Sequence, residues 1–234
     1  MPLLSRYHSG GYSEDQFNLE KRIIRHSLFF PLLLVVVIWL IKLFEFEFQL
    51  DFSIWGVLPL TERGLRGILF SPLIHSNFNH LIANTFPLFI LTFSLFFFYR
   101  KSAYTIFALI YLFSGIFVWL GGREALHIGA SGIVYGLAGF LFLSGIIGFN
   151  IRLLTISLIV SLLYGGMFWG IFPVKPDISW ESHLWGGVSG FGLALLYYKS
   201  APARSEEEAA EETEEELTDE TEFPDEELTD KEND

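Results

Sequence analysis

The chain has 234 residues, of which 51% are hydrophobic, with a mean hydropathy of +0.43 and no cysteine. Apolar runs of the length found here are unusual in soluble domains, and the absence of cysteine excludes disulfides, thiolate nucleophiles and cysteine metal ligands. The formal net charge is −12, but residues 205–234 hold 17 acidic residues and one lysine, a charge of −16, so the remaining 204 residues carry +4. We therefore expect a mildly basic membrane protein followed by an acidic tail.

The N-terminal part of the chain contains a polar segment, a first membrane span and a long connection. Residues 1–26 are polar, and they are not a signal peptide, because the apolar stretch that follows is too long and lacks a small-residue cleavage site. Residues 27–44 (SLFFPLLLVVVIWLIKLF) predict a transmembrane helix, with Lys42 near its end able to extend its ammonium group to the interface. Residues 45–78 are amphipathic and rich in phenylalanine, with Trp55 among them, which favours a segment lying in the membrane interface.

Five further apolar stretches, each near the length that a bilayer requires, predict transmembrane helices. They are residues 80–99, 103–120, 130–148, 153–173 and 183–198. In this arrangement nine lysines and arginines fall on one side of the membrane and five on the other, which places both termini in the cytoplasm. The sequence thus predicts an all-α membrane protein with a six-helix bundle over residues 27–200 and an acidic, disordered tail over residues 201–234.

Four polar side chains lie inside the predicted spans, where such groups are costly and usually functional or paired. They are His80, Asn84, Ser131 and His183. All four fall near the extracytoplasmic ends of the second, fourth and sixth spans. These residues, which come from parts of the sequence that are far apart, are therefore expected at the same depth in the membrane and near the same membrane surface.

Ser131 begins a helix directly after a glycine-rich loop, in the stretch HIGASGIVYGLAGF of residues 127–140. Backbone N–H groups at a helix start have no intrahelical acceptor, and together with the positive helix end they favour a developing oxyanion. Gly129 and Gly132 leave room for a substrate backbone, and Tyr135 shares the helix face of Ser131. The alternative is a packing patch, in which the glycines form a GxxxG pair for helix contact.

His183 opens the last span, in the stretch SHLWGGVSGFG. A neutral imidazole is a suitable general base for a serine hydroxyl. Gly186 and Gly190 give this helix a small face that favours close packing against the fourth span, which would bring His183 within reach of Ser131. The alternative is an interfacial histidine bonded to a carbonyl, but the two residues together favour a nucleophile and its base.

His80 and Asn84 lie four residues apart and therefore on one face of the second span. Side-chain donors aimed at a tetrahedral oxyanion are what acyl transfer requires, and an ordinary interhelical hydrogen bond is the alternative. His75 lies off this face and is expected in the loop.

A metal site is the main competing chemistry, and the sequence argues against it. No HExxH motif occurs, and no carboxylate lies within a predicted span. Asp177 and Glu181 precede His183 and are expected in the loop. Because no third member of a triad is evident, a dyad of Ser131 and His183 without metal or cofactor is the more economical interpretation.

Three blocks of the sequence resemble the rhomboid intramembrane serine proteases. GLRGILFSPLIHSNFNHLIANTFPL contains the H-x-x-x-N pattern as His80 and Asn84, HIGASGIVYGLAGF contains G-x-S-G around Ser131, and SHLWGGVSGFGLAL contains the histidine of the last helix. The resemblance covers residues 55–198 well and the first span loosely. One departure is visible, since many members carry a Trp-Arg pair in the first loop and the nearest stretch here reads GLRG.

The resemblance implies a six-helix core and a serine endopeptidase that cleaves transmembrane-helix substrates near the extracytoplasmic membrane surface. By this resemblance Ser131 is the nucleophile and His183 the base, while His80, Asn84 and the Ser131 backbone N–H stabilise the oxyanion and Tyr135 packs against the His183 ring. We accordingly expect transmembrane proteins as substrates and the lipid bilayer as surroundings, with no nucleic acid or metal partner, in a multi-pass protein of the bacterial plasma (inner) membrane.

Two functions of other classes compete with this interpretation. A non-catalytic rhomboid-like binder would recognise transmembrane helices without cutting them, and the presence of the complete set of serine, two histidines and asparagine favours the protease. A small channel or transporter would show inverted repeats and ionisable groups near mid-membrane, and the sequence shows neither.

Overall fold

A computed structural model describes residues 14–163, 167–174 and 179–200, all of which belong to one compact unit, Met1–Ala201. Within these residues the regular elements are helices, apart from one isolated antiparallel β-bridge between Val57 and His127. This confirms the prediction of an all-α chain. The acidic tail, the first half of the polar N-terminal segment (residues 1–13) and Asp177 lie outside the described residues.

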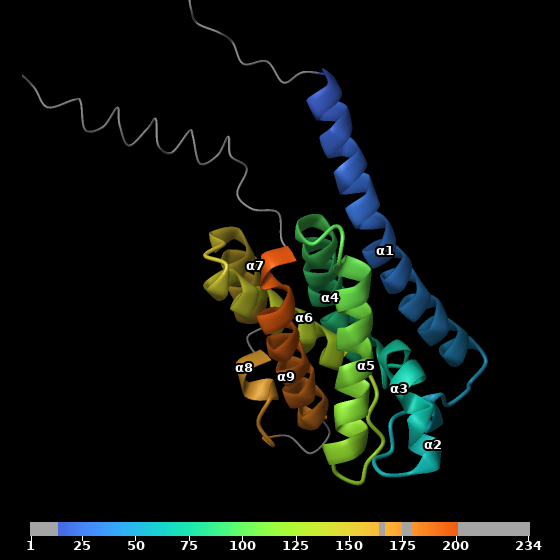
Figure 1. Ribbon diagram of the computed structural model, residues 1–234. Coiled ribbons are helices and arrows are strands. Elements are labelled where there is room, and N and C mark those ends of the chain that lie inside the picture. Colours follow the sequence, from blue (N-terminus) through green and yellow to red (C-terminus); the bar gives the residue numbers. More distant parts are fainter. Residues whose placement is uncertain (1–13, 164–166, 175–178, 201–234) are drawn as a thin grey trace, which may run out of the picture. The chain divides into compact units, whose positions relative to one another are not determined.

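Figure 1 shows how the helices of this unit follow one another along the chain. In chain order they are α1 (Glu14–Glu47), η1 (Ser53–Trp55), α2 (Glu62–Leu65), α3 (Gly67–Phe70), η2 (Ser71–Leu73), α4 (Phe78–Phe98), α5 (Ala103–Gly121), α6 (Ser131–Ile147), α7 (Ile151–Leu163), α8 (Met167–Gly170), α9 (Trp180–Tyr197) and η3 (Tyr198–Ser200).

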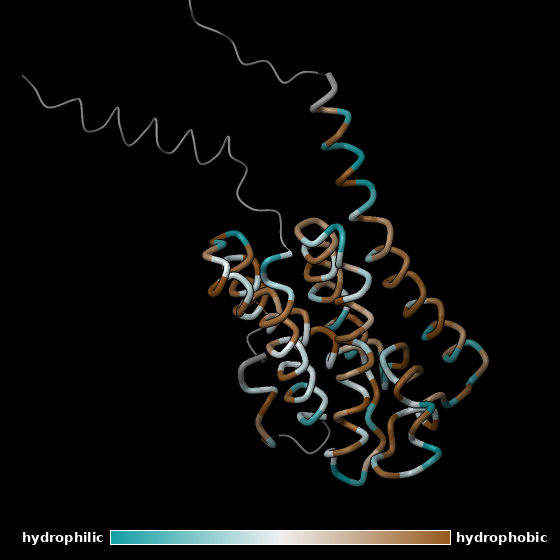
Figure 2. Tube along the Cα trace, viewed as in Figure 1, coloured by the Kyte–Doolittle hydropathy of each residue, from teal (hydrophilic) through white to brown (hydrophobic). Residues whose placement is uncertain are grey.

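Three helices within the described residues are long and apolar enough to cross a membrane: Phe17–Glu47, Phe78–Phe98 and Ala103–Gly121. Helices α6 and α7 are apolar but shorter. The predicted span over residues 153–173 is divided between α7 and α8. Figure 2 shows the apolar middle of α1 and the polar turns at its N-terminal end.

Helix α1 begins at Glu14, well before the predicted boundary at residue 27, and is 34 residues long. At 1.5 Å per residue a helix of this length measures roughly 51 Å, whereas the hydrocarbon core of a bilayer is about 30 Å thick. The helix is therefore longer than the hydrocarbon layer is thick, and the polar residues at its start account for the excess length.

Helix α6 lies at the centre of the unit, where it packs against α9, α7, α4 and α5. Of its 17 residues, 11 are buried. Its apolar side chains join the main hydrophobic cluster, in which the Phe140 ring meets the Tyr99 ring edge to face at 4.9 Å. A short helix can be buried on nearly all sides only because small residues let its neighbours approach closely.

The contact between α6 and α9 is made by glycines on both helices. A Cβ atom added to Gly186 would collide with the Gly132 carbonyl oxygen, and one added to Gly190 would collide with the Gly136 carbonyl oxygen. In both cases the overlap is with backbone, which cannot swing aside as a flexible side chain can. The backbones of the two helices therefore touch directly, as the small faces of the sequence predict.

Lys42 does not extend its ammonium group freely to the interface, and that prediction was wrong. Its side chain is buried, with Nζ 2.7 Å from Oε2 of Glu45 and 3.2 Å from the carbonyl oxygen of Ser76. The Glu45 Oε1 atom accepts a hydrogen bond of 2.9 Å from the Phe52 backbone N–H. The carboxylate one turn away forms a charge-assisted hydrogen bond with the lysine, and it also ties the loop after α1 to the helix.

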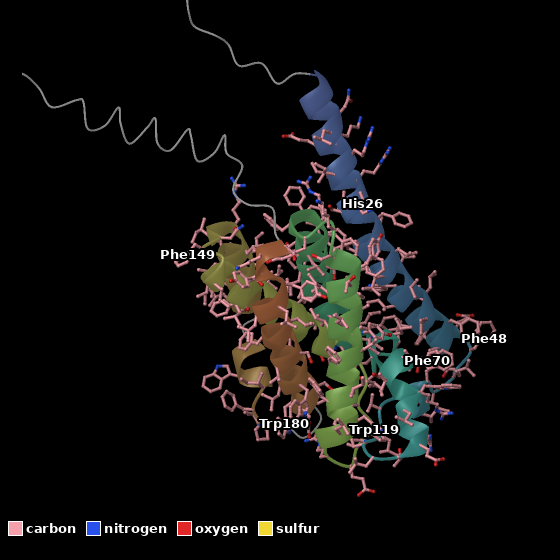
Figure 3. The ribbon with its side chains drawn as sticks, viewed as in Figure 1. His26, Phe48, Phe70, Trp119, Phe149 and Trp180 are labelled. Atoms are coloured by element: carbon pink, nitrogen blue, oxygen red, sulfur yellow. The ribbon has the colours of Figure 1, made fainter. Side chains whose placement is uncertain are left out.

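The segment from η1 to the end of α2 and its C-cap residue Arg66 contains an arginine–tryptophan contact that the sequence did not reveal. The Arg66 guanidinium carbon lies 4.3 Å from the centre of the Trp55 ring, a cation–π geometry. The segment is tied to α5, because Trp119 Nε1 donates to the Thr61 carbonyl at 2.9 Å. Figure 3 places Trp119 and Trp180 near one end of the bundle and Phe149 near the other.

We expect the α6–α9 contact to be sensitive to a single methyl group. Gly190→Ala should lower the thermal unfolding temperature in detergent, because overpacking of about 1–3 kcal/mol outweighs the helix-propensity gain of up to about 1 kcal/mol. Gly187→Ala on the same helix is the matched control, because a Cβ there meets nothing within 4 Å. Equal unfolding temperatures for the two variants would contradict backbone contact at Gly190.

Candidate active site

Ser131 is the first residue of α6 and follows a loop with an unusual backbone. Gly129 has a φ of +110°, a conformation that side chains with a Cβ rarely adopt. Its N–H donates to the Ser71 carbonyl at 2.8 Å, and Val57 and His127 exchange two backbone hydrogen bonds of 2.9 Å. The loop that delivers Ser131 is therefore held by the segment before α4.

His183 lies in the first turn of α9, and its side chain is buried. The Nδ1 atom is 2.8 Å from the Gly170 carbonyl oxygen. Because a carbonyl only accepts hydrogen bonds, Nδ1 must carry the proton, and Nε2 then holds a lone pair. This is the tautomer that can accept a proton from a hydroxyl group.

A stacked aromatic ring also fixes the orientation of the His183 imidazole. The Tyr135 ring stacks on it with centroids 4.2 Å apart and planes inclined by only 6°. A Cβ atom added to Gly170 would collide with the Tyr135 hydroxyl and lie 3.0 Å from His183 Nδ1, so α8 approaches both rings closely. The carbonyl and the tyrosine together leave the imidazole little freedom to turn.

The first turns of α6 and α9 lie side by side, which brings Ser131 and His183 to the same place in the bundle. Tyr135, one turn after Ser131, stacks on His183, and a Cβ on Gly132 would lie 3.2 Å from the Ser182 carbonyl oxygen. Tyr135 of α6 thus contacts His183 of α9, and Gly132 of α6 lies against Ser182 of α9. Ser131 itself is 9% exposed.

His80, in the first turn of α4, faces the Gly129 loop. A Cβ on Gly129 would lie 2.6 Å from Cε1 and 2.8 Å from Nε2 of His80, so this edge of the ring rests on the glycine backbone. Asn84 is buried, and its Nδ2 donates to the His80 carbonyl at 2.9 Å. An asparagine amide has two N–H donors, so this helical bond still leaves one for another acceptor.

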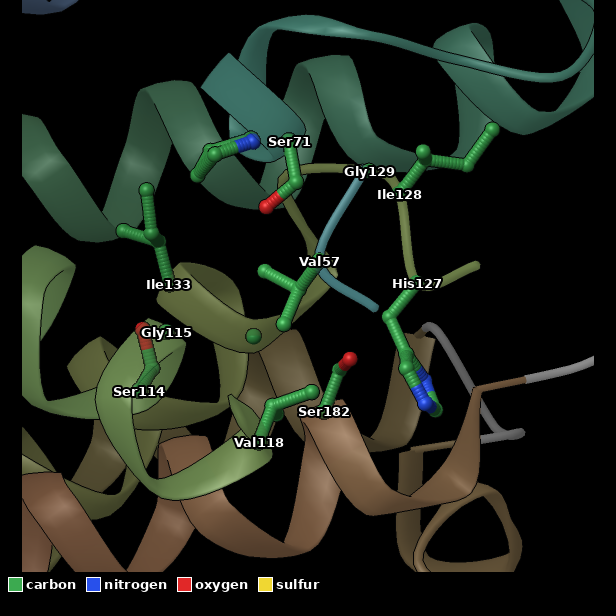
Figure 4. A pocket seen from close by; sticks show the side chains of 12 residues that line it. Val57, Ser71, Ser114, Gly115, Val118, His127, Ile128, Gly129, Ile133 and Ser182 are labelled. Atoms are coloured by element: carbon green, nitrogen blue, oxygen red, sulfur yellow. The ribbon is translucent and has the colours of Figure 1, made fainter. Parts of the chain in front are cut away.

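A small cavity with a mixed polar and apolar lining lies beside the Gly129 loop (Figure 4). Its volume is about 20 Å³, and Ser71, Ser114, Ser182 and His127 are among the residues that line it. A cavity of this volume has room for about one water molecule.

Glu181 is a residue that the sequence interpretation misplaced. It was expected in the loop before His183, but it lies in the first turn of α9 and is 2% exposed. Its Oε1 atom is 3.4 Å from Nε of Arg123, which lies in the loop before α6. The ion pair therefore joins the start of α9 to the loop that carries Ser131.

His127 reinforces the same connection. Its Nε2 lies 3.0 Å from the Arg123 carbonyl and therefore carries the proton, so Nδ1 accepts from the Ser179 hydroxyl at 2.5 Å. The Ser179 hydroxyl also lies 2.6 Å from that of Ser182. Burial lowers the pKa of His127. No motif in the sequence identifies this network, because each of its residues is ordinary by itself.

His75 lies in the loop, as expected, but it is only 1% exposed. Its Nε2 accepts the Ala130 backbone N–H at 3.4 Å, and its ring meets the His80 ring edge to face at 5.1 Å. Burial lowers the pKa of His75 to about 3. Within the described part of the chain, no group of three or more histidine, aspartate or glutamate side chains is arranged to hold a metal ion.

Comparison with known proteins identifies a protein family and several relatives of this chain. Residues 62–200 match the family model described as the Rhomboid domain. Uncharacterized proteins of Mycobacterium tuberculosis and Mycobacterium bovis are each 34% identical over 182 residues, which cover 73% of this chain and 74% of the relative. An uncharacterized protein of Mycobacterium leprae is 34% identical over 161 residues, 64% of this chain and 62% of the relative.

We expect His75 to make the fold sensitive to acid. Because its pKa falls from 6.5 to about 3 on folding, the unfolded chain binds the proton first, and stability is lost as the pH falls from about 6.5 to 3. His75→Gln keeps a neutral acceptor for Ala130 and should weaken this dependence by an amount on the order of a few kcal/mol. Thermal unfolding in detergent between pH 7 and 4 measures the slope, and identical slopes in both proteins would refute the assignment.

Proposed function

The chain belongs to the rhomboid family and is an integral membrane protein, and from this premise we propose that it is an intramembrane serine endopeptidase. In this proposal Ser131 is the nucleophile and His183 is its general base. The observation that carries it is the hydrogen bond between His183 Nδ1 and the Gly170 carbonyl, which leaves a lone pair on Nε2 beside the start of α6. Transmembrane helices of other proteins are the proposed substrates.

The proposed topology has six spans, with both termini in the cytoplasm of a bacterial cell and the protein in the plasma (inner) membrane. Figure 1 shows the turns 99–102 and 148–150 at one end of the bundle and the loop 122–130 at the other. Arg100, Lys101 and Arg152 lie at or next to the first end, which supports its cytoplasmic placement. The proposed catalytic residues are then near the extracytoplasmic surface, and substrates would be cut there.

The proposed reaction begins when His183 Nε2 takes the proton of Ser131 Oγ, and Oγ attacks the carbonyl carbon of the scissile peptide bond. The negative charge that develops on the carbonyl oxygen would be stabilised by the Ser131 backbone N–H, His80 and Asn84. His183 then gives its proton to the leaving amine. Water, activated by the same histidine, hydrolyses the acyl ester and restores Ser131.

The supporting residues differ in how they fit this sequence of steps. The expectation that Gly129 and Gly132 leave room for a substrate backbone was wrong: a Cβ on Gly129 would meet the His80 ring and one on Gly132 the Ser182 carbonyl oxygen, so the two glycines let α4 and α9 approach the start of α6. Tyr135 holds the plane of the imidazole by stacking, so the ring keeps its direction when it gains and loses a proton. A binder that only recognises transmembrane helices would not need the fixed tautomer at His183.

The two members of the dyad should act as a unit. Ser131→Ala and His183→Ala should each abolish cleavage of a model transmembrane substrate in liposomes, and the double variant should be little worse, because the members of a catalytic pair are not additive. All three proteins should fold, which thermal unfolding checks. Substantial cleavage by purified Ser131→Ala would overturn the protease proposal at this residue and leave the non-catalytic binder.

Asn84→Ala should lower kcat by ~10²-fold, about 3 kcal/mol, with a smaller effect on KM, because an oxyanion donor acts mainly in the transition state. Ser94→Ala is the matched control on the same helix: Ser94 donates to the Ile90 carbonyl at 2.8 Å, as Asn84 donates to the His80 carbonyl. Loss of such a helical bond alone should affect both variants alike. An unchanged kcat in Asn84→Ala would assign Asn84 a structural bond only.

A further inference from the structure

Three hydrogen bonds link Ser76, Asn77 and His80 in a ring at the start of α4. Asn77 is the N-cap of α4, and its Oδ1 accepts the His80 backbone N–H at 2.9 Å. Asn77 Nδ2 lies 3.3 Å from the Ser76 hydroxyl oxygen. That oxygen lies 3.2 Å from His80 Nδ1, which completes the set.

The directions of the two bonds made by Asn77 follow from donor chemistry. A backbone N–H can only donate, so the atom of Asn77 that receives the His80 N–H is the amide oxygen. The other Asn77 atom is then NH₂, which can only donate to the Ser76 hydroxyl oxygen. The Ser76 hydroxyl has one proton and a second lone pair, and in the proposed arrangement it donates that proton to His80 Nδ1. A neutral ring that accepts at Nδ1 carries its proton on Nε2.

The position of Ser76 is itself anchored from α1. The Lys42 ammonium group donates to the Ser76 carbonyl oxygen at 3.2 Å and to Glu45 at 2.7 Å, while Glu45 accepts the Phe52 N–H. Lys42 therefore holds the backbone of Ser76, the residue whose hydroxyl lies against the His80 ring.

We propose that Ser76 and Asn77, anchored by Lys42, are positioning residues that fix the tautomer of His80 so that its Nε2–H faces the Gly129 loop. The Nε2 edge of His80 is the one that rests on Gly129, two residues before Ser131. A donor there would stabilise the oxyanion, whereas the other tautomer would place a lone pair against it. This inference rests on the proposed function for its purpose, but the tautomer itself does not require catalysis.

The test is the protonation state of the two His80 ring nitrogens in the full-length protein. The protein is labelled with ¹⁵N-histidine, held in detergent in a Ser131→Ala background, and the His80 signals are identified by their loss in His80→Gln. We expect Nε2 to carry the proton and Nδ1 to be an acceptor. A proton on Nδ1 instead would overturn the proposal, and because no turnover is needed, a protein that proves not to be a protease still gives the answer.

Two substitutions test the role of the neighbours. Ser76→Ala removes the donor to Nδ1 and should produce a mixture of tautomers, whereas Ser76→Thr retains the hydroxyl and should restore the single form. Asn77→Asp keeps the N-cap acceptor but offers a carboxylate to the Ser76 hydroxyl, so His80 Nδ1 should become protonated. Unchanged His80 signals in both Ser76→Ala and Asn77→Asp would overturn the assignment of these residues.

Activity provides a second measurement with the catalytic serine restored. Ser76→Ala should lower kcat about 10-fold with little change in KM, because only part of one oxyanion donor is lost. Ser76→Thr should recover most of this loss. If the tautomer shifts and kcat does not, His80 is not an oxyanion donor, which would correct the proposed function and leave the positioning role in place.

Discussion

Direct contact between two helix backbones is the constraint on which the rest of this structure depends. Gly186 and Gly190 of α9 lie against the carbonyl oxygens of Gly132 and Gly136, at distances that exclude a Cβ atom. The first turns of α6 and α9 can lie this close only because these positions lack side chains, since any larger residue would separate the axes. The position of Ser131 relative to His183 is therefore determined by residues that take no part in chemistry.

The candidate site depends on main-chain groups to an unusual extent. The tautomer of His183 is set by the Gly170 carbonyl, the ring of His75 is held by the Ala130 N–H, and the Gly129 loop is held by a backbone bond to Ser71. Backbone groups have fixed positions once the helices are packed, so they orient side chains without the loss of rotamer freedom that a side-chain partner would require.

The helix starts that carry Ser131 and His183, and their close packing, could be predicted because their residues carry local signals. A serine after a glycine-rich loop and a histidine beside small residues mark helix starts that can pack closely. The Gly170 carbonyl could not be found in this way, because every residue has a carbonyl. Glu181, Lys42 and the Trp55–Arg66 contact were missed for another reason: their partners are set by three-dimensional packing, and hydropathy alone places a charged residue outside the bundle.

The bridge between Val57 and His127 also makes the loop before α6 part of a mechanical connection. Trp55 and Arg66, whose side chains suit the headgroup region of a membrane, lie on the same segment as Val57, and His127 is two residues before Gly129. A bilayer of different thickness would displace the headgroups relative to the bundle. A displacement of this segment would be passed to Val57 and, through the two backbone hydrogen bonds of the bridge, to the loop that ends at Ser131.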